Sequence, residues 1–151
     1  MEFKKGCLDH PAVIELLEEH LSEMYATSPP ESVHALDLSK LKTPTVSFWS
    51  VWDGAQLLGC GAIKWLGESH AELKSMRTRA HFRGRGVAKQ LLTHLVDQAR
   101  QNGYQRISLE TGTEPYFAPA RGLYQRFGFT TCEPFADYVP DPNSVFMTME
   151  L

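Results

Sequence analysis

A loop rich in glycine and arginine in the middle of the chain constrains the fold more than any other feature. In the segment AHFRGRGVAKQLL (residues 80–92), Arg83, Gly84, Arg85 and Gly86 stand directly before an apolar helical pattern. Glycine has no Cβ atom, so the backbone there can approach a bulky anion closely. The first N–H groups of a helix lack partners and carry a partial positive charge. We therefore expect this loop to bind a phosphate or pyrophosphate.

The segments on either side of the loop predict a strand, a helix and a second strand. HAELKSMRT (70–78) precedes the loop, and YQRISLETG (104–112) alternates with the period of two that is typical of a strand. Between them, the apolar residues at helical spacing are Val87, Leu91, Leu92, Leu95 and Ala99. A surface turn with solvated arginines is the alternative, but a turn before a helix more often carries an Asp or Ser cap. The setting therefore favours the anion site.

The rest of the chain predicts antiparallel strands and further helices. Asp53-Gly54 joins two apolar segments, 45–52 and 56–66, and is a strong hairpin signal. A helix begins at Pro11, and its expected buried face consists of Ile14, Leu17, Leu21 and Met24. The remaining expected elements are strands at 3–8, 129–135 and 144–151 and a short helix at 120–127. This order predicts one α+β domain over residues 1–151, with a mixed, mostly antiparallel sheet and flanking helices.

Composition and motifs exclude several classes of function. The 151 residues carry a net charge of −3 at pH 7, which argues against broad nucleic-acid binding. No apolar run reaches membrane-spanning or signal-peptide length, so no membrane partner is expected. Cys7, Cys60 and Cys132 are far apart and odd in number, which favours reduced thiols in a cytoplasmic protein. No His or Cys pair has metal-ligand spacing, so no metal is expected.

Other anion-binding motifs fit the loop less well. The loop lacks the G-x-x-x-x-G-K-[ST] pattern of a Walker A loop. A dinucleotide-binding fingerprint needs Gly or Ala where Lys89 stands and a second strand-helix-strand unit, for which the chain has no room. A nucleic-acid patch would have to form without interleaved aromatic residues other than Phe82. Its basic residues would be Lys74, Arg77, Arg79, Arg83, Arg85 and Lys89.

The pattern that remains is [Q/R]-x-x-G-x-[G/A], formed by Arg83, Gly86 and Ala88. It resembles the pyrophosphate loop of the GNAT N-acetyltransferases, which bind acetyl-CoA. LYQRFGF (123–129) is similar to a later helix of that family, and the two motifs occur in the family's order. The segments SMRT, LETG and DPNSVFM resemble those of small bacterial GNAT proteins known only as acetyltransferases. This resemblance covers nearly the whole chain and implies the GNAT fold with splayed central strands.

The resemblance also implies a binding site for acetyl-CoA as cosubstrate. The residues that it assigns to the pyrophosphate are Arg83, Gly84, Arg85, Gly86, Val87, Ala88 and Lys89. The backbone of Met76, Arg77 and Thr78 would bind the pantetheine at a strand bulge. The sequence carries a weak sign of that bulge, because Ala71 and Leu73 alternate on one face and Met76 breaks the parity.

Two residues are implied as catalytic. Tyr124 matches the family's tyrosine that protonates the departing thiolate, although a core aromatic on a short helix is the alternative. Glu72 matches a family glutamate that removes the proton from the amine; an ordinary strand carboxylate, with a water chain as the base, is equally compatible. No cysteine has a neighbouring histidine in a recognisable motif, so direct attack of a primary amine in a ternary complex is expected.

The acceptor is left open by the sequence. A small-molecule or peptide amine is expected as partner, and residues that could contact it are Tyr25, His34, Glu114, Tyr116, Tyr138 and Asp141. A terminal edge strand is also compatible with a homodimer. The alternative to an enzyme is a non-catalytic acyl-CoA-binding sensor with the same fold, which would keep the phosphate loop and dispense with the acid.

Overall fold

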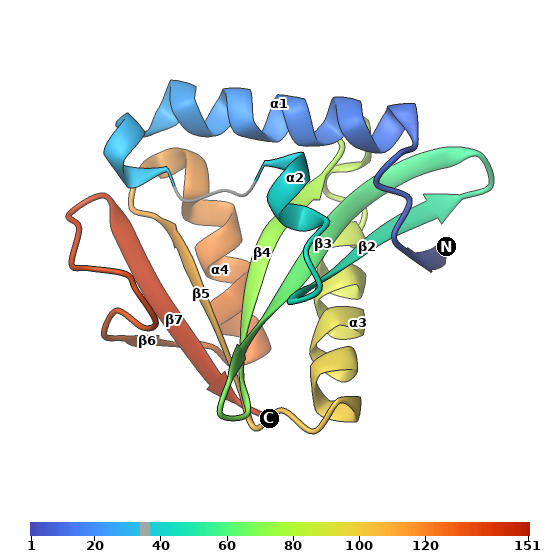
Figure 1. Ribbon diagram of the computed structural model, residues 1–151. Helices are drawn as coiled ribbons and strands as arrows, with labels where there is room; N and C mark the ends of the chain where they lie inside the picture. The colour runs from blue at the N-terminus through green and yellow to red at the C-terminus, as the bar shows by residue number, and fades with distance from the viewer. Residues whose placement is uncertain (34–36) are drawn as a thin grey trace.

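Seven strands form one sheet in the computed structural model, which describes residues 1–33 and 37–151 (Figure 1). The strands are β1 (Glu2–Lys5), β2 (Val46–Asp53), β3 (Gln56–Gly67), β4 (His70–Thr78), β5 (Arg106–Gly112), β6 (Thr130–Cys132) and β7 (Ser144–Glu150). Their order is β1-β2-β3-β4-β5-β7-β6, and only β4 and β5 are parallel neighbours. These two are parallel because a helix carries the chain from the end of β4 back to the start of β5.

Helices cover both faces of the sheet, which confirms the predicted α+β class (Figure 1). They are α1 (Pro11–Thr27), α2 (Leu38–Leu41), α3 (Val87–Gln101) and α4 (Ala118–Phe127). Ala62 and Ile63 are neighbours in β3 and therefore point to opposite faces. Ala62 packs in a cluster with residues of α1 and α2, and Ile63 packs in a cluster with residues of α3 and α4. No helix in the described parts of the chain is long and apolar enough to cross a membrane.

The predicted apolar face is confirmed for α3 and wrong for α1. All five residues expected on the α3 face are buried. The residues of α1 that the structure buries are Val13, Leu16, Leu17 and His20, so of the expected face only Leu17 is buried. Both sets have helical spacing, because apolar residues lie on more than one side of this helix. Packing on β2 and β3 then selects the side, and Met24 is left facing a cavity.

A bulge interrupts β4 where the parity of its apolar residues changes. Across the β3–β4 pair, Cys60 faces Arg77 but Ala62 faces Lys74. Gly61 therefore lies opposite two residues of β4, Ser75 and Met76, and Ser75 adopts a φ of 54°. A bulge re-aims the side chains that follow it. Met76 accordingly packs toward the α3 side, and Arg77 reaches α1.

The two central strands separate beyond their first few residues. β4 and β5 pair only from His70–Arg106 to Glu72–Ser108, although both strands continue further. Figure 1 shows them converging near the C-terminus and diverging toward the end of the sheet that α1 crosses. Along the gap, the edge of each strand that faces the other has no strand partner, while β4 stays paired with β3 and β5 with β7. This gap connects the two faces of the sheet.

Candidate active site

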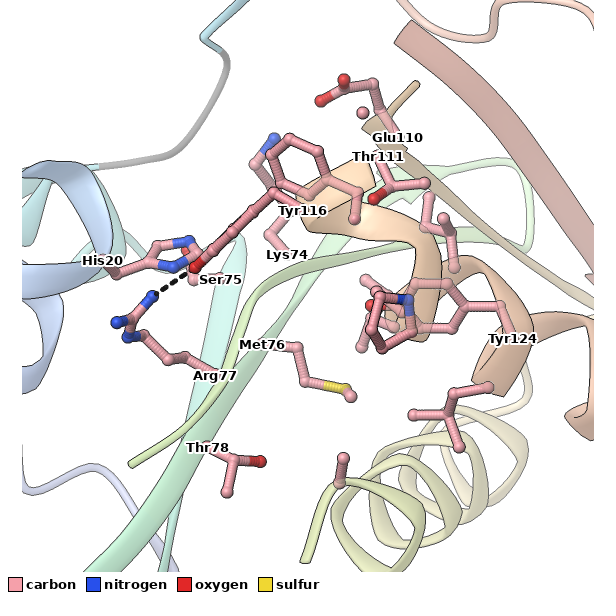
Figure 2. Close-up of a pocket in the computed structure, with 18 of the residues that line it drawn as sticks. His20, Lys74, Ser75, Met76, Arg77, Thr78, Glu110, Thr111, Tyr116 and Tyr124 are labelled. Atoms are coloured by element: carbon pink, nitrogen blue, oxygen red, sulfur yellow. Dashed lines mark hydrogen bonds between the residues drawn. The ribbon is translucent and has the colours of Figure 1, made fainter. Parts of the chain in front are cut away.

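A cavity of about 670 Å³ occupies the gap between β4 and β5 (Figure 2). One end is lined by the loop before α3 and by α4, and the other end by residues of α1 and of the segment before β7. We call these the loop end and the α1 end. The strand residues between them are 72–78 of β4 and 109–112 of β5. A molecule bound along the cavity could therefore reach from one face of the sheet to the other.

The glycine-rich loop leaves open space at the start of α3. Gly86 is the residue that caps the helix, with a φ of 79° and no side-chain hydrogen bond to the first turn. Gly84 also has a positive φ, of 76°, and a Cβ atom added at either position would meet no atom within 4 Å. The first N–H groups of α3 therefore face free space, as an anion-binding loop requires.

All but one of the residues predicted at this loop line the cavity. Those that do are Arg83, Gly84, Gly86, Val87, Ala88 and Lys89. The exception is Arg85, whose guanidinium lies over the ring of Phe82, 5.6 Å from its centroid. Arg126 of α4 adds a further cation at this end. The loop end therefore combines free N–H groups with positive charge, and this fits the pyrophosphate of acetyl-CoA.

Arg77, on the bulged strand, extends its side chain away from the loop. The guanidinium is 2.5 Å from Glu19 and 2.9 Å from Glu23 of α1, and it donates a hydrogen bond of 3.4 Å to Tyr116 (Figure 2). Burial lowers the pKa of Arg77, but hydrogen bonds to these three residues outweigh burial and raise the pKa above its usual value. The Arg77 side chain thus connects α1 to the bulge. Any contact of Arg77 with bound acetyl-CoA would therefore be made by its backbone.

Tyr124 of α4 lies against the same gap. Its side chain is buried, lines the cavity and packs against the ring of Phe129. Burial, followed by the charge of Glu110, raises the pKa of Tyr124 to about 12. The phenol therefore keeps its proton at neutral pH and can donate a hydrogen bond.

Glu72 is buried at the α1 end and is already hydrogen-bonded. Its carboxylate accepts hydrogen bonds of 2.5 Å from the Tyr138 hydroxyl and 3.1 Å from the Lys74 ammonium. Only 3% of the Glu72 side chain is exposed, so the structure offers little free surface for a further partner. The pKa of Tyr138 is raised by burial and by the adjacent Glu72 carboxylate, and the phenol remains a donor.

Two cavity residues with clearly shifted pKa values were not predicted as site residues. Glu110 of β5 lines the cavity, and burial raises its pKa to about 7. Period-two alternation could have indicated it, since it shares a sheet face with Ser108, the partner of Glu72. His20 of α1 also lines the cavity, and burial followed by the charge of Arg77 lowers its pKa to about 4. His20 carried no sequence signal, because it lies outside the face expected for α1.

Of the residues predicted to contact an acceptor, only some line the cavity. Tyr116 and Tyr138 line the cavity, whereas Tyr25, Glu114 and Asp141 do not. His34 lies outside the described residues. Asp141 instead holds two lining residues in place. It accepts a hydrogen bond of 2.7 Å from Ser32 and one of 2.8 Å from the backbone N–H of Asn143. Ser32 and Asn143 both line the α1 end.

The charges at the α1 end do not form a free basic patch. Lys74 pairs with Glu72, and Arg77 pairs with Glu19 and Glu23. Lys74 and Arg77, two members of the basic cluster considered for nucleic-acid binding, are therefore already paired with carboxylates. Among the described residues, no three His, Cys, Asp or Glu side chains gather in a way that could hold a metal ion.

Comparison with known proteins places this chain in a family. Residues 11–129 match the acetyltransferase (GNAT) family. The chain is 54% identical over 151 residues to the Bacillus subtilis uncharacterized N-acetyltransferase YsnE, covering 100% of both chains. It is 52% identical over 148 residues to the Escherichia coli uncharacterized N-acetyltransferase YedL, covering 98% of this chain and 93% of that one.

Solved structures share the fold. A Klebsiella pneumoniae protein assigned as an acyl-CoA N-acyltransferase superposes with a TM-score of 0.84 and 30% identity, over 99% of this chain and 97% of that one. The Thermoplasma acidophilum PaiA N-acetyltransferase, solved in complex with coenzyme A, superposes with a TM-score of 0.73 and 14% identity over the whole of both chains. The expected fold with splayed central strands is thus confirmed. The chain belongs to the acetyltransferase (GNAT) family, and it is an acetyltransferase.

Proposed function

We propose that the enzyme transfers the acetyl group of acetyl-CoA to a primary amine by direct attack within a ternary complex. The observation that carries this proposal is the cavity between β4 and β5, which reaches from the glycine-rich loop to the α1 end. A donor entering over the loop and an acceptor entering beside α1 would meet at the bulge. Bringing both substrates together in one site lowers the entropic part of the barrier.

The donor site is built from main-chain groups and cations. The N–H groups at the start of α3 would bind the pyrophosphate, with Arg83 and Lys89 compensating its charge. The main-chain groups of Met76 to Thr78 that face the gap have no partner in β5 and would bind the pantetheine along β4. Arg85, which the resemblance assigned to the pyrophosphate, lies on Phe82 and is the least supported member of this set.

Direct attack is supported by the positions of the cysteines. None of the three lines the cavity as described. Burial raises the pKa of Cys60 to about 12, so this thiol stays protonated and is a poor nucleophile. Tyr124 is proposed as the general acid for the departing thiolate. Glu72, the base that the resemblance implies, stays a prediction.

Ligand-dependent stability tests the donor. Acetyl-CoA at about 100 times its Kd should raise the free energy of unfolding by roughly 2.7 kcal/mol, measured by thermal unfolding. Release of free thiol from acetyl-CoA in the presence of amines then tests transfer. The amines would be spermidine, kanamycin, a short peptide and the standard L-amino acids. An unchanged Tm at millimolar acetyl-CoA would contradict the donor site.

A further inference from the structure

Glu110 lies where the two central strands have just parted. Ser108 is the last residue of β5 paired with β4, and Glu110 is the next residue on the same face. Ile107 and Leu109 alternate with them and pack in the cluster with α3 and α4. The Glu110 side chain therefore faces the α1 side, where it lines the cavity. Figure 2 shows Glu110 on β5, across the gap from Lys74 and Ser75.

The carboxylate of Glu110 has no cation of its own among the described residues. Lys74 is paired with Glu72, and Arg77 is paired with two carboxylates of α1. No Lys, Arg or His in the described ranges forms an ion pair with Glu110, whose side chain is half-buried. A half-buried carboxylate without a counter-ion favours a cationic ligand. The ammonium form of a primary amine is such a ligand.

Glu110 differs from Glu72 in how readily its carboxylate can take up a proton. Glu72 accepts hydrogen bonds from both Lys74 and Tyr138, so taking up a proton would cost those bonds. Glu110 has no such pair of charged or phenolic donors in the described structure. Burial raises its pKa to about 7; a hydrogen bond from the Ser144 hydroxyl and the charge of Lys74 oppose this rise, and the charges of Glu72 and Asp141 add to it. A general base works best when its pKa lies near the working pH.

We propose that Glu110 is the catalytic base, which pairs with the ammonium group of the acceptor and takes its first proton. This inference rests on the proposed transfer reaction. The neutral amine then attacks the acetyl carbon, so that a C–N bond forms and the C–S bond breaks. The thiolate takes a proton from Tyr124, and the second amine proton passes to solvent. Glu110 then releases its proton to solvent and the Tyr124 phenolate takes one up, so that both groups are restored and one proton is released overall. The acceptor class that follows is a primary amine that is cationic at neutral pH.

The pH dependence of turnover provides the test. Only ionised Glu110 can take a proton, so kcat/KM should fall as the pH drops below about 7. Glu110→Gln keeps the shape of the side chain and should lower kcat by about 10²-fold or more. It should also abolish the fall of kcat/KM at low pH, which is the acidic limb of the pH profile. The groups that face Glu110 and could also titrate are Lys74, Glu72, Tyr124, Tyr138 and Asp141. Glu72→Gln should therefore retain the limb, and Glu133→Gln, at an exposed site, should match the wild type.

Two further measurements separate this proposal from the proposed function. The acetyl-CoA-induced rise in Tm should persist in Glu110→Gln, which shows that the fold and the donor site are intact. Turnover of a panel amine with an unchanged acidic limb in Glu110→Gln would overturn the role of Glu110 and leave acetyl transfer standing. If no panel amine reacts, ¹³C NMR titration of the wild type against Glu110→Gln still decides. A Glu110 carboxyl that titrates at the ordinary value near 4.3 would overturn the proposal.

Discussion

Burial sets the protonation states of the residues around the gap, and it acts in opposite directions on acids and bases. It raises the pKa of Tyr124 to about 12 and that of Glu110 to about 7, and it lowers the pKa of His20 to about 4. Burial always disfavours the charged form. At neutral pH the cavity therefore holds a protonated phenol, a neutral imidazole and a carboxyl group close to its midpoint.

Removing the Tyr124 hydroxyl should slow the reaction without weakening substrate binding. Loss of a general acid typically costs 10²- to 10⁴-fold in rate, so Tyr124→Phe should lower kcat by about 10²-fold with little change in KM. Steady-state kinetics with the best amine of the panel would measure this. Tyr104→Phe is the matched control, because Tyr104 stacks on Trp65 and does not line the cavity. Equal kcat values for both variants would remove Tyr124 from the mechanism.

Residues with a local signal were predictable, and residues defined by tertiary packing were not. Arg83, Gly86 and Ala88 form a contiguous pattern whose spacing is visible in the sequence. Glu110 becomes a candidate base only because β4 and β5 separate beside it and because the nearby Lys74 is already paired with Glu72. His20 reaches the cavity only through the side of α1 that the sheet selects. Neither fact can be read from neighbouring residues in the chain.

Among the elements, α3 and its loop form the part that sequence predicts best. The α3 face is a single apolar stripe, and a glycine with a positive φ stands at each end of the helix. These are Gly86 at the start and Gly103 after the end, with φ angles of 79° and 81°. Helix α1 has apolar residues on more than one side, so its buried face depended on the sheet beneath it.

These two glycines allow backbone strain to be separated from anion binding. Alanine at either position is forced into the left-handed region, which costs roughly 1–2 kcal/mol of stability. Gly86→Ala should also weaken acetyl-CoA binding at least tenfold, because its Cβ would enter the space in front of the helix. Gly103→Ala should bind acetyl-CoA normally. Calorimetric titration with acetyl-CoA would compare them, and equal affinities would show that the loop does not hold the pyrophosphate.

The whole molecule consists of two half-sheets that share only a short parallel seam. The strands β1 to β4 form one half and β5 to β7 the other, joined by pairs from His70–Arg106 to Glu72–Ser108. The fold class and the order of elements followed from the sequence. The point where the seam ends did not, because it depends on the bulge at Ser75 and on non-local pairing.

Hydrogen exchange should detect a donor bound in the gap. Unpaired N–H groups of β4 after Glu72 and of β5 after Ser108 are expected to exchange quickly, and acetyl-CoA should slow them. The hairpin of β2 and β3 is paired along its length apart from a bulge between Val51 and Trp52, and it serves as the internal reference. Mass spectrometry of exchanged peptides would report the difference. Equal protection with and without acetyl-CoA in residues 73–78 would place the donor elsewhere.

The gap between β4 and β5 also bears on how such an enzyme can be redesigned. In the proposed donor half of the gap, main-chain groups supply most of the binding contacts beside Arg83 and Lys89, whereas the α1 end is lined by residues such as His20, Met24 and Asn143. Main-chain groups are the same whatever residues the gene encodes. Exchanging side chains of α1 and of the segment before β7 is therefore a route to new acceptors that leaves the acetyl supply untouched.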